Sequence, residues 1–140
     1  FLETKFEPTE ADNKIIENNL IEFNRKKAPF TQEEEFVDLN YHVKDEQGNI
    51  IPGICASMYL WHVVIIRILF VHESYRGKQL GSALLLKVEN EAKQRGAKLI
   101  HLNTFLFQAK DFYLKFGYEV FGQIDNYPEA KQFFFLKKHL

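Results

Sequence analysis

Residues 65–92 read IIRILFVHESYRGKQLGSALLLKVENEA, and this stretch decides the fold. It predicts a buried strand over 65–71, a short polar turn over 72–75, and an amphipathic helix opened by residues 76–82. The first turn of a helix has backbone N–H groups without intrahelical partners, and the helix dipole adds positive potential there. An arginine, a lysine and two glycines in the turn add charge and let a ligand approach the backbone. The arrangement favours a bound phosphate or pyrophosphate.

Two common phosphate-binding loops do not fit this turn. A Walker loop needs G-x-x-x-x-G-K-[ST], but residues 77–82 lack that spacing and no lysine follows Gly81. A dinucleotide fingerprint needs G-x-G-x-x-G, which the turn does not contain. The turn instead resembles the acetyl-CoA loop of the GNAT N-acetyltransferase superfamily: Arg or Gln, two residues, Gly, one residue, then Gly or Ala. Arg76 and Gly81 match this pattern, and Gln79 stands where its first glycine is usual.

A second segment carries the same resemblance. Residues 109–118, AKDFYLKFGY, look like the family's A-x-x-F-Y-x-x-x-G-[FY] segment. The run from Thr104 to Ala109 is similar to that of small, single-domain bacterial members, and the resemblance extends from about residue 37 to the C-terminus. It implies an α/β (α+β) fold: a mixed, mostly antiparallel central sheet with a splayed parallel strand pair and flanking helices, the GNAT-like acyl-CoA N-acyltransferase fold.

The resemblance also implies a site for acetyl-CoA as cosubstrate, with no metal. The strands at 65–71 and 98–104 would splay apart, and the pantetheine arm would enter the gap and bond to the exposed backbone. Tyr113 would be the catalytic general acid, because a phenol pKa near 10 is close enough to that of a thiol to protonate the leaving thiolate. The residues expected to bind the cosubstrate are Leu69, Phe70, Val71, Arg76, Gly77, Lys78, Gln79, Leu80, Gly81 and Ser82.

Composition sets broader limits. A chain of 140 residues is expected to form one domain over 1–140, and its 46% apolar residues suffice for a real core. A net charge of −1 argues against a nucleic-acid partner held by bulk positive charge. Cys55 is the single cysteine, so an intrachain disulfide is excluded and a reducing, cytoplasmic location is favoured. We expect Cys55 to be a small core residue.

One apolar run, residues 54–71, is long enough to suggest a membrane span. His62 and Arg67 interrupt it, and β-branched residues are frequent, so two buried strands explain it better. The sequence therefore predicts a soluble protein with no membrane partner.

The remaining elements follow from periodicity and turn signals. Thr9 is expected to cap a helix that runs to about Arg25. The helix opened by Gly81 is expected to bury a stripe of apolar side chains and to carry its glutamates on the solvent-facing side. The buried stripe comprises Leu80, Ala83, Leu84, Val88 and Ala92, and the solvent-side pairs are Glu89–Lys93 and Glu91–Arg95. Strands are predicted over 36–43, 50–59 (an edge or bulge at Pro52 and Gly53), 63–71 (both faces covered), 98–104, 118–123 and 132–138, with a turn at 45–49 and a short helix over 108–116.

The residue that deprotonates the attacking amine stays open. The options are His62, His72, His101 and Glu73 near the central strands, His42 and Glu35 farther off, and a water chain. His101 lies inside a strand, where a satisfied core histidine is the more common outcome. Arg67 stands in an apolar strand, so it is expected to be ion-paired or to face a cleft.

The resemblance implies an acetyl-CoA-dependent N-acetyltransferase in which an amine attacks the thioester directly within a ternary complex. A small cationic amine, attracted by the acidic residues 33–35, is the first expectation for the acceptor, and a peptide amine is the second. One alternative, based on the departure from the family pattern at Gln79, is a catalytically weak CoA-binding sensor or interaction module of the same fold. Another is a phosphate-binding domain unrelated to CoA. The apolar residues 133–135 offer a surface for a homodimer.

Overall fold

The computed structural model describes residues 9–105 and 109–140 of the chain. Its contacts divide the chain into two compact units, Phe1–Thr31 and Gln32–Leu140, and each is described by itself. Whether the whole chain forms one domain therefore stays a prediction. Within the described ranges, no helix is both long and apolar enough to cross a lipid bilayer.

The first unit contains one helix, α1 (Glu10–Lys27), as the sequence predicts. Thr9 caps it: the Thr9 hydroxyl oxygen accepts a hydrogen bond from the backbone N–H of Asp12 at 3.2 Å. Basic residues occupy its last turn, where the helix dipole favours positive charge. Pro29 follows two residues after the helix and disfavours its continuation.

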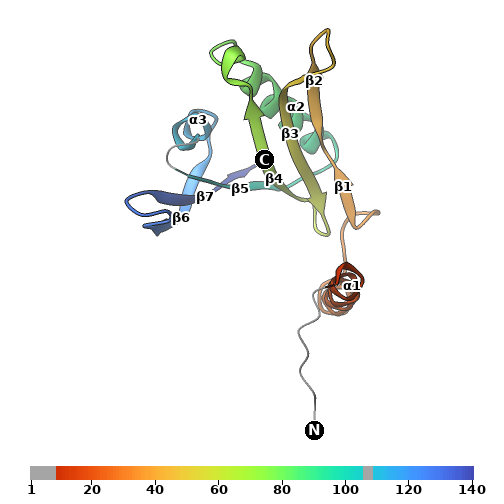
Figure 1. Cartoon of the computed structure of the whole chain (residues 1–140). Helices are drawn as coiled ribbons and strands as arrows, with labels where there is room; N and C mark the ends of the chain where they lie inside the picture. Colours follow the sequence, from red (N-terminus) through yellow and green to blue (C-terminus); the bar gives the residue numbers. More distant parts are fainter. Residues whose placement is uncertain (1–8, 106–108) are drawn as a thin grey trace. The chain divides into compact units, whose positions relative to one another are not determined.

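The second unit is a mixed sheet with two helices (Figure 1). Its strand order in the described residues is β1-β3-β4-β5-β7-β6, and β2 also pairs with β3. All neighbouring strands are antiparallel except β4 and β5, which are parallel, so the predicted fold class is confirmed. The strands are β1 (Phe36–Asp38), β2 (Tyr41–Lys44), β3 (Ile50–Tyr59), β4 (Val63–Val71), β5 (Leu99–Phe105), β6 (Glu119–Asp125) and β7 (Gln132–His139).

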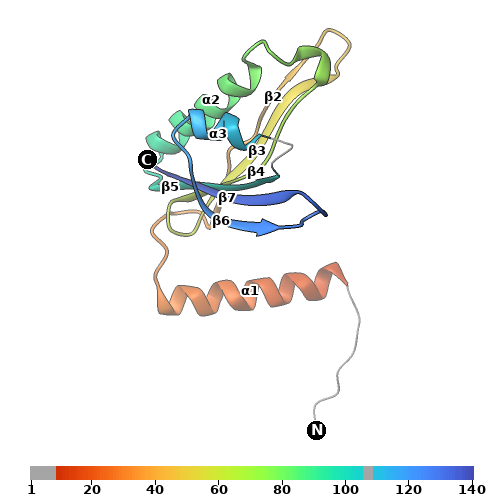
Figure 2. The ribbon, with the colours of Figure 1, turned by 90° about the vertical axis from the view of Figure 1, so that its left-hand side faces the viewer.

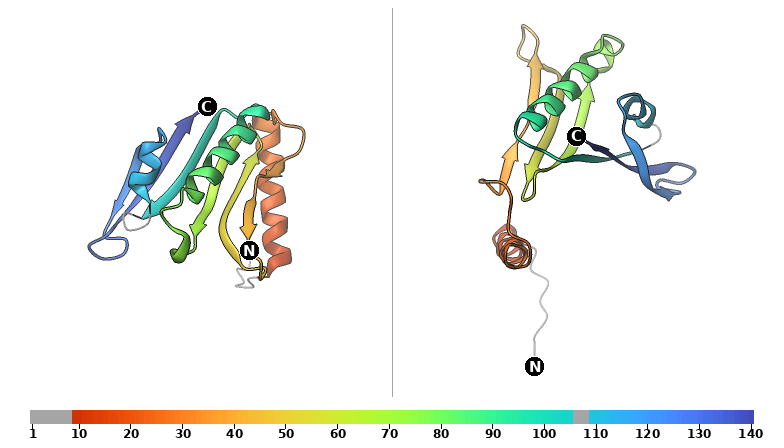
Figure 3. Two further views of the ribbon diagram at one scale, coloured as in Figure 1. Left: turned by 90° about the horizontal axis from the view of Figure 1, so that it is seen from above. Right: turned by 180° about the vertical axis from the view of Figure 1, so that it is seen from behind.

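The helices α2 (Leu80–Gln94) and α3 (Lys110–Lys115) lie on the same side of this sheet (Figure 2). Figure 3 shows α2 over the β3–β4 half and α3 over the β5–β7 half. A continuous core fills the space between the helices and the strands. Fully or nearly fully buried side chains in it include Ile54, Val64, Leu85, Val88, Ile100, Leu102 and Leu136.

Two sequence expectations about strands are wrong. The predicted strand 36–43 is two short strands, because the Asn40 side chain replaces a ladder partner and its Oδ1 accepts from the Ala56 N–H at 3.0 Å. The strand 63–71 is not covered on both faces: Ile68 is 57% exposed. The irregularity predicted at Pro52 is present in the β2–β3 pairing, where the register shifts between His42 and Lys44. The alternative, that Pro52 marks an edge strand, is wrong, because β3 has paired strands on both sides.

Three side-chain expectations also fail. Cys55 is exposed rather than buried, because it lies on the β3 face opposite its buried neighbours. Ala83 is exposed, and Leu85 belongs to the buried side of α2 instead. Glu89 is 2% exposed, so it does not lie on the solvent-facing side. The Glu91–Arg95 ion pair does form there, at 2.8 Å.

Candidate active site

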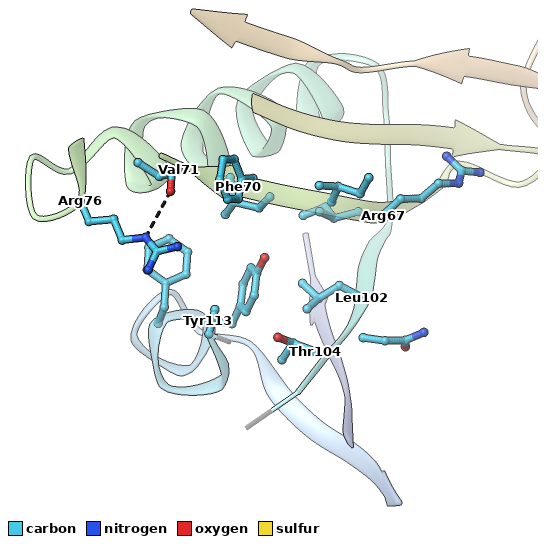
Figure 4. A pocket seen from close by; sticks show the side chains of 14 residues that line it. Arg67, Phe70, Val71, Arg76, Leu102, Thr104 and Tyr113 are labelled. Atoms are coloured by element: carbon cyan, nitrogen blue, oxygen red, sulfur yellow. Dashed lines mark hydrogen bonds between the residues drawn. The ribbon is translucent and has the colours of Figure 1, made fainter. Parts of the chain in front are cut away.

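The site lies where the two parallel strands separate. The β4–β5 pairing covers Val63–Ile66 against Leu99–Leu102, whereas both strands continue beyond this register. A pocket of about 650 Å³ occupies the opening, and its lining comes from β4, β5, α3 and the start of α2 (Figure 4). The lining residues are Ile66, Arg67, Ile68, Leu69, Phe70, Val71, Arg76, Gly81, Leu102, Asn103, Thr104, Ala109, Phe112 and Tyr113.

A bulge in β4 shapes this opening. In the β3–β4 register Ala56 pairs with Ile66 and Cys55 pairs with Ile68, which leaves Arg67 as the extra residue. A bulge of this kind shifts the alternation of side chains along the strand. Before it, Val64 and Ile66 are buried; after it, Ile68 is exposed. Such a break is invisible in the sequence, because every residue around it except Arg67 is apolar.

The loop before α2 holds the basic group expected there. The Arg76 Nε donates a hydrogen bond to the Val71 carbonyl oxygen at 3.2 Å, which brings the guanidinium to the pocket edge (Figure 4). Gly81 lies in the first turn of α2, and a Cβ there would lie 3.5 Å from Val71 Cγ2 and 3.7 Å from Phe112 Cζ. The glycine thus lets the helix start lie close to the end of β4.

Two residues of the loop before α2, Gly77 and Gln79, have unusual backbone dihedral angles. Gly77 has φ +82°, which suits glycine. Gln79 has φ +60° and ψ +22°, in the left-handed region that disfavours a side chain with a Cβ. The position at which the sequence departs from the family pattern is therefore one where a glycine would be unstrained.

The ten residues expected to bind cosubstrate divide into two groups. Five of them line the pocket, namely Leu69, Phe70, Val71, Arg76 and Gly81. The other five lie in the loop or first helical turn but are not part of the lining, namely Gly77, Lys78, Gln79, Leu80 and Ser82. Lys78 points its ammonium over the Tyr75 ring, 5.1 Å from the centroid.

Tyr113 reaches the pocket from α3. Its side chain is 4% exposed, and the hydroxyl points across the opening toward β4 (Figure 4). No group among the described residues forms a hydrogen bond with this hydroxyl, so it can meet a ligand atom. Burial raises the pKa of Tyr113 to about 12, and the phenol keeps its proton at neutral pH.

A buried charge network stands behind Tyr113. The Tyr113 ring packs edge-on against Tyr118, with centroids 5.6 Å apart. The Tyr118 hydroxyl donates to Glu89 Oε2 at 3.0 Å, and Lys138 Nζ donates to the same oxygen at 2.9 Å. Burial and the Glu89 charge raise the pKa of Tyr118. The helix periodicity predicted that Glu89 faces solvent. That prediction was wrong because Glu89 is buried against Lys138, a partner 49 residues away that a local pattern does not include.

The candidates for the proton acceptor are spread over the unit. His101 Nε2 and the Tyr59 hydroxyl are 2.8 Å apart, and burial lowers the pKa of His101. His72 Nδ1 accepts from the Ser74 N–H at 3.2 Å in the turn before α2. Neither histidine lines the pocket, so the general base stays open.

Asn103, Leu102 and Phe112 line the pocket but were not among the expected site residues. Asn103 had a usable signal, since it is a polar residue near the end of a predicted strand on the opposite side from the buried Leu102 and Thr104. No group of three or more potential metal-ligating side chains gathers in the described part of the chain.

The sheet opens where its two parallel strands separate, next to the loop that leads into α2. This arrangement is that of an acyl-CoA-transferase-like fold, and comparison with known proteins supports the same class. The GNAT acetyltransferase domain model matches residues 38–120. Blasticidin-S acetyltransferase of Streptomyces morookaense is 30% identical over 96 residues, which cover 68% of this chain and 70% of that protein.

Solved structures give the same result. An acetyltransferase from Bacillus cereus is 32% identical, with a TM-score of 0.85 over 99% of this chain and 98% of that one. A proposed streptothricin acetyltransferase from Bacillus anthracis, solved in complex with acetyl coenzyme A, shares the fold at 20% identity, with a TM-score of 0.63 over 74% of this chain and 62% of that one. The chain belongs to the GNAT acetyltransferase family.

Proposed function

We propose that this protein transfers an acetyl group from acetyl-CoA to an amine. The observation that carries the proposal is the pocket at the β4–β5 opening, which has the Arg76 guanidinium at one end and the Tyr113 hydroxyl across it. A phosphate-bearing thioester needs a cationic, amide-rich end and a proton donor near its sulfur. Both requirements have candidates in this pocket.

The pyrophosphate of the cosubstrate would bind the loop and first helical turn, from Arg76 to Ser82. Leu69, Phe70 and Val71 pair with β3 but have no β5 partner, so their backbone groups on the pocket side can bond to the pantetheine amides. A structure of the same fold was solved in complex with acetyl coenzyme A, which supports this choice of cosubstrate.

The chemistry needs one proton donor and one proton acceptor. The neutral amine attacks the thioester carbonyl, a C–N bond forms, and the C–S bond then breaks. The proton of Tyr113 passes to the departing thiolate. The surplus proton of the amine passes to a base or to water and then returns to the Tyr113 phenolate, which restores the enzyme. Burial raises the pKa of Tyr113 to about 12, so the hydroxyl carries its proton at neutral pH, although this pKa lies farther from that of a thiol than the ordinary phenol value near 10.

The alternative is a protein of the same fold that binds CoA without efficient turnover. The strained Gln79 is the observation that favours it, since a distorted loop could bind the cosubstrate in an unproductive position. Tight acetyl-CoA binding combined with slow turnover across a broad panel of amines would identify a sensor.

The first test is calorimetric titration with acetyl-CoA, with ATP as the control for phosphate binding alone. We expect acetyl-CoA to bind selectively, and Gly81→Trp to abolish binding because the indole would fill the space beside Val71 and Phe112. Leu86→Trp is the matched control, since Leu86 lies on the same helix and is 45% exposed. Equal binding of ATP, or normal acetyl-CoA affinity in Gly81→Trp with a native circular dichroism spectrum, would contradict the proposal.

A further inference from the structure

Arg67 holds an unusual position at the pocket. It is the bulged residue of β4 and lines the opening, yet its side chain leads away from Tyr113 toward β3 (Figure 4). Asn103 of β5 lines the same opening and is exposed, on the side of its strand opposite the buried Leu102 and Thr104. Arg67 and Asn103 directly follow Ile66 and Leu102, the last pair of the β4–β5 ladder, so one cation and one amide form a second end of the pocket, where the strands begin to separate.

The guanidinium of Arg67 is fixed but not neutralised. Its Nη1 donates to the Ser57 hydroxyl at 2.6 Å, and Ser57 is only 2% exposed, so the contact is anchored on β3. Among the described residues Arg67 forms no ion pair. Asp38 is the β1 partner of Ser57, and no ion pair forms between its carboxylate and Arg67. A cation held this way retains donors for an external anion.

The proposed reaction assigns this end of the pocket to the acceptor. If the pyrophosphate lies at Arg76 and the thioester lies near Tyr113, the cosubstrate occupies the end beside α2 and α3. The amine must then approach from the other end, where Arg67 and Asn103 lie. A rigid strand is a suitable base for a group that orients a substrate.

We infer that Arg67 binds an anionic group of the acceptor, so that the substrate is an amine that also carries a carboxylate or a phosphonate. A planar guanidinium pairs with either group through two parallel hydrogen bonds. This inference rests on the proposed acetyl transfer and adds a substrate class to it. It extends the expectation of a cationic amine to a zwitterion, whose ammonium must lose a proton before attack.

Matched acceptors test the inference. Acetylation is followed by chromatography of released CoA, with glycine, aminomethylphosphonate and glycinamide as one set, and 3-aminopropionate, 2-aminoethylphosphonate and 3-aminopropionamide as another. We expect kcat/KM to be at least tenfold higher for the anionic members than for the amides. Comparison of carboxylate with phosphonate shows which anion fits.

Variants then assign the preference to one side chain. Arg67→Gln should reduce the preference to within twofold and leave the KM for acetyl-CoA unchanged, whereas Arg67→Lys should keep part of it. Arg95→Gln is the matched control, because Arg95 is an exposed arginine of the same unit that pairs with Glu91. A raised KM for acetyl-CoA in Arg67→Gln, or a preference that survives in it, would overturn the inference.

A binding measurement separates this inference from the proposed function. Glycine and glycinamide are titrated, in the presence of CoA, into 15N-labelled protein, and the Arg67 side-chain resonance is followed. Turnover of amides and anions at equal rates would support acetyl transfer and overturn the anion site. No turnover with any amine, but a shift of the Arg67 resonance with glycine alone, would overturn the transfer and support the anion site. No turnover and no selective shift would overturn both.

Discussion

Gln79 shows how one residue can depart from a family pattern and still keep the backbone geometry. Its φ of +60° is the conformation in which a side chain is penalised and glycine is not. We expect Gln79→Gly to raise the free energy of unfolding by about 0.5–1 kcal/mol. This gain is the backbone penalty that glycine removes, reduced by the larger conformational entropy that glycine gives to the unfolded chain. Urea unfolding measures this.

Lys78→Gly is the control for that experiment, because Lys78 is not among the residues with positive φ. It should destabilise the protein or leave its stability unchanged. If both glycine variants gained stability equally, the left-handed backbone geometry at Gln79 would not explain the gain in Gln79→Gly. Calorimetry of Gln79→Gly with acetyl-CoA also shows whether loop strain lowers cosubstrate affinity.

Tyr113 supports a kinetic and a pH prediction. Tyr113→Phe should bind acetyl-CoA with near-normal affinity and slow the chemical step roughly 10²-fold, the lower range for general acid catalysis. Single-turnover rates measure this, and an unchanged rate would remove Tyr113 from the mechanism. Phe116→Leu is the aromatic control on the same short segment, since Phe116 does not line the pocket.

The pH dependence follows from the raised pKa of Tyr113. Because burial raises that pKa to about 12, above the value near 10 for an unfolded chain, the native state holds this proton more strongly. The resulting stability is fully present below about pH 10 and is lost as the pH rises towards 12. Ultraviolet titration of tyrosinate should therefore lose its step near pH 12 in Tyr113→Phe, whereas loss of a step near pH 10 would contradict the burial.

At the scale of elements, one ion pair joins α2 to β7. Glu89 is 2% exposed and Lys138 Nζ lies 2.9 Å from it, so removing the lysine leaves a buried carboxylate with only the Tyr118 hydroxyl. Loss of one partner of a buried pair typically costs 3–5 kcal/mol, and we expect roughly 2–4 kcal/mol for Lys138→Met because Lys138 is partly exposed.

Lys137→Met is the matched control for that substitution. Lys137 neighbours Lys138 on β7 but pairs at 4.0 Å with an exposed Glu119, and exposed pairs contribute about 0–1 kcal/mol. Denaturant unfolding of the two variants should therefore differ by more than about 1 kcal/mol. Equal losses would show that the Glu89 network contributes nothing beyond an ordinary surface pair.

Elements were predicted well where periodicity was strong. The strands at 50–59 and 63–71 match β3 and β4 residue for residue, and both have long apolar runs bounded by turn residues. The single strand expected at 36–43 failed because the Asn40 side chain enters the ladder, and side-chain bonding of this kind depends on a partner strand.

At the scale of the whole molecule, the resemblance of two short segments correctly gave the family, the fold class and the parallel strand pair. Half of the expected cosubstrate residues line the pocket, together with Tyr113. A homodimer, the absence of a nucleic-acid or membrane partner and a cytoplasmic location stay predictions.

The sequence by itself determined most of the order of elements and the Thr9 cap of α1, and it predicts an anion-binding turn at 76–82, because local periodicity, charge and backbone preference act over a few residues. Only the tertiary structure decided that β4 bulges at Arg67, that Glu89 is buried against Lys138, and that Arg67 and Tyr113 lie at different ends of one pocket. These features depend on which strands and helices pack together, and contacts between distant residues are set by the register and packing of the whole sheet.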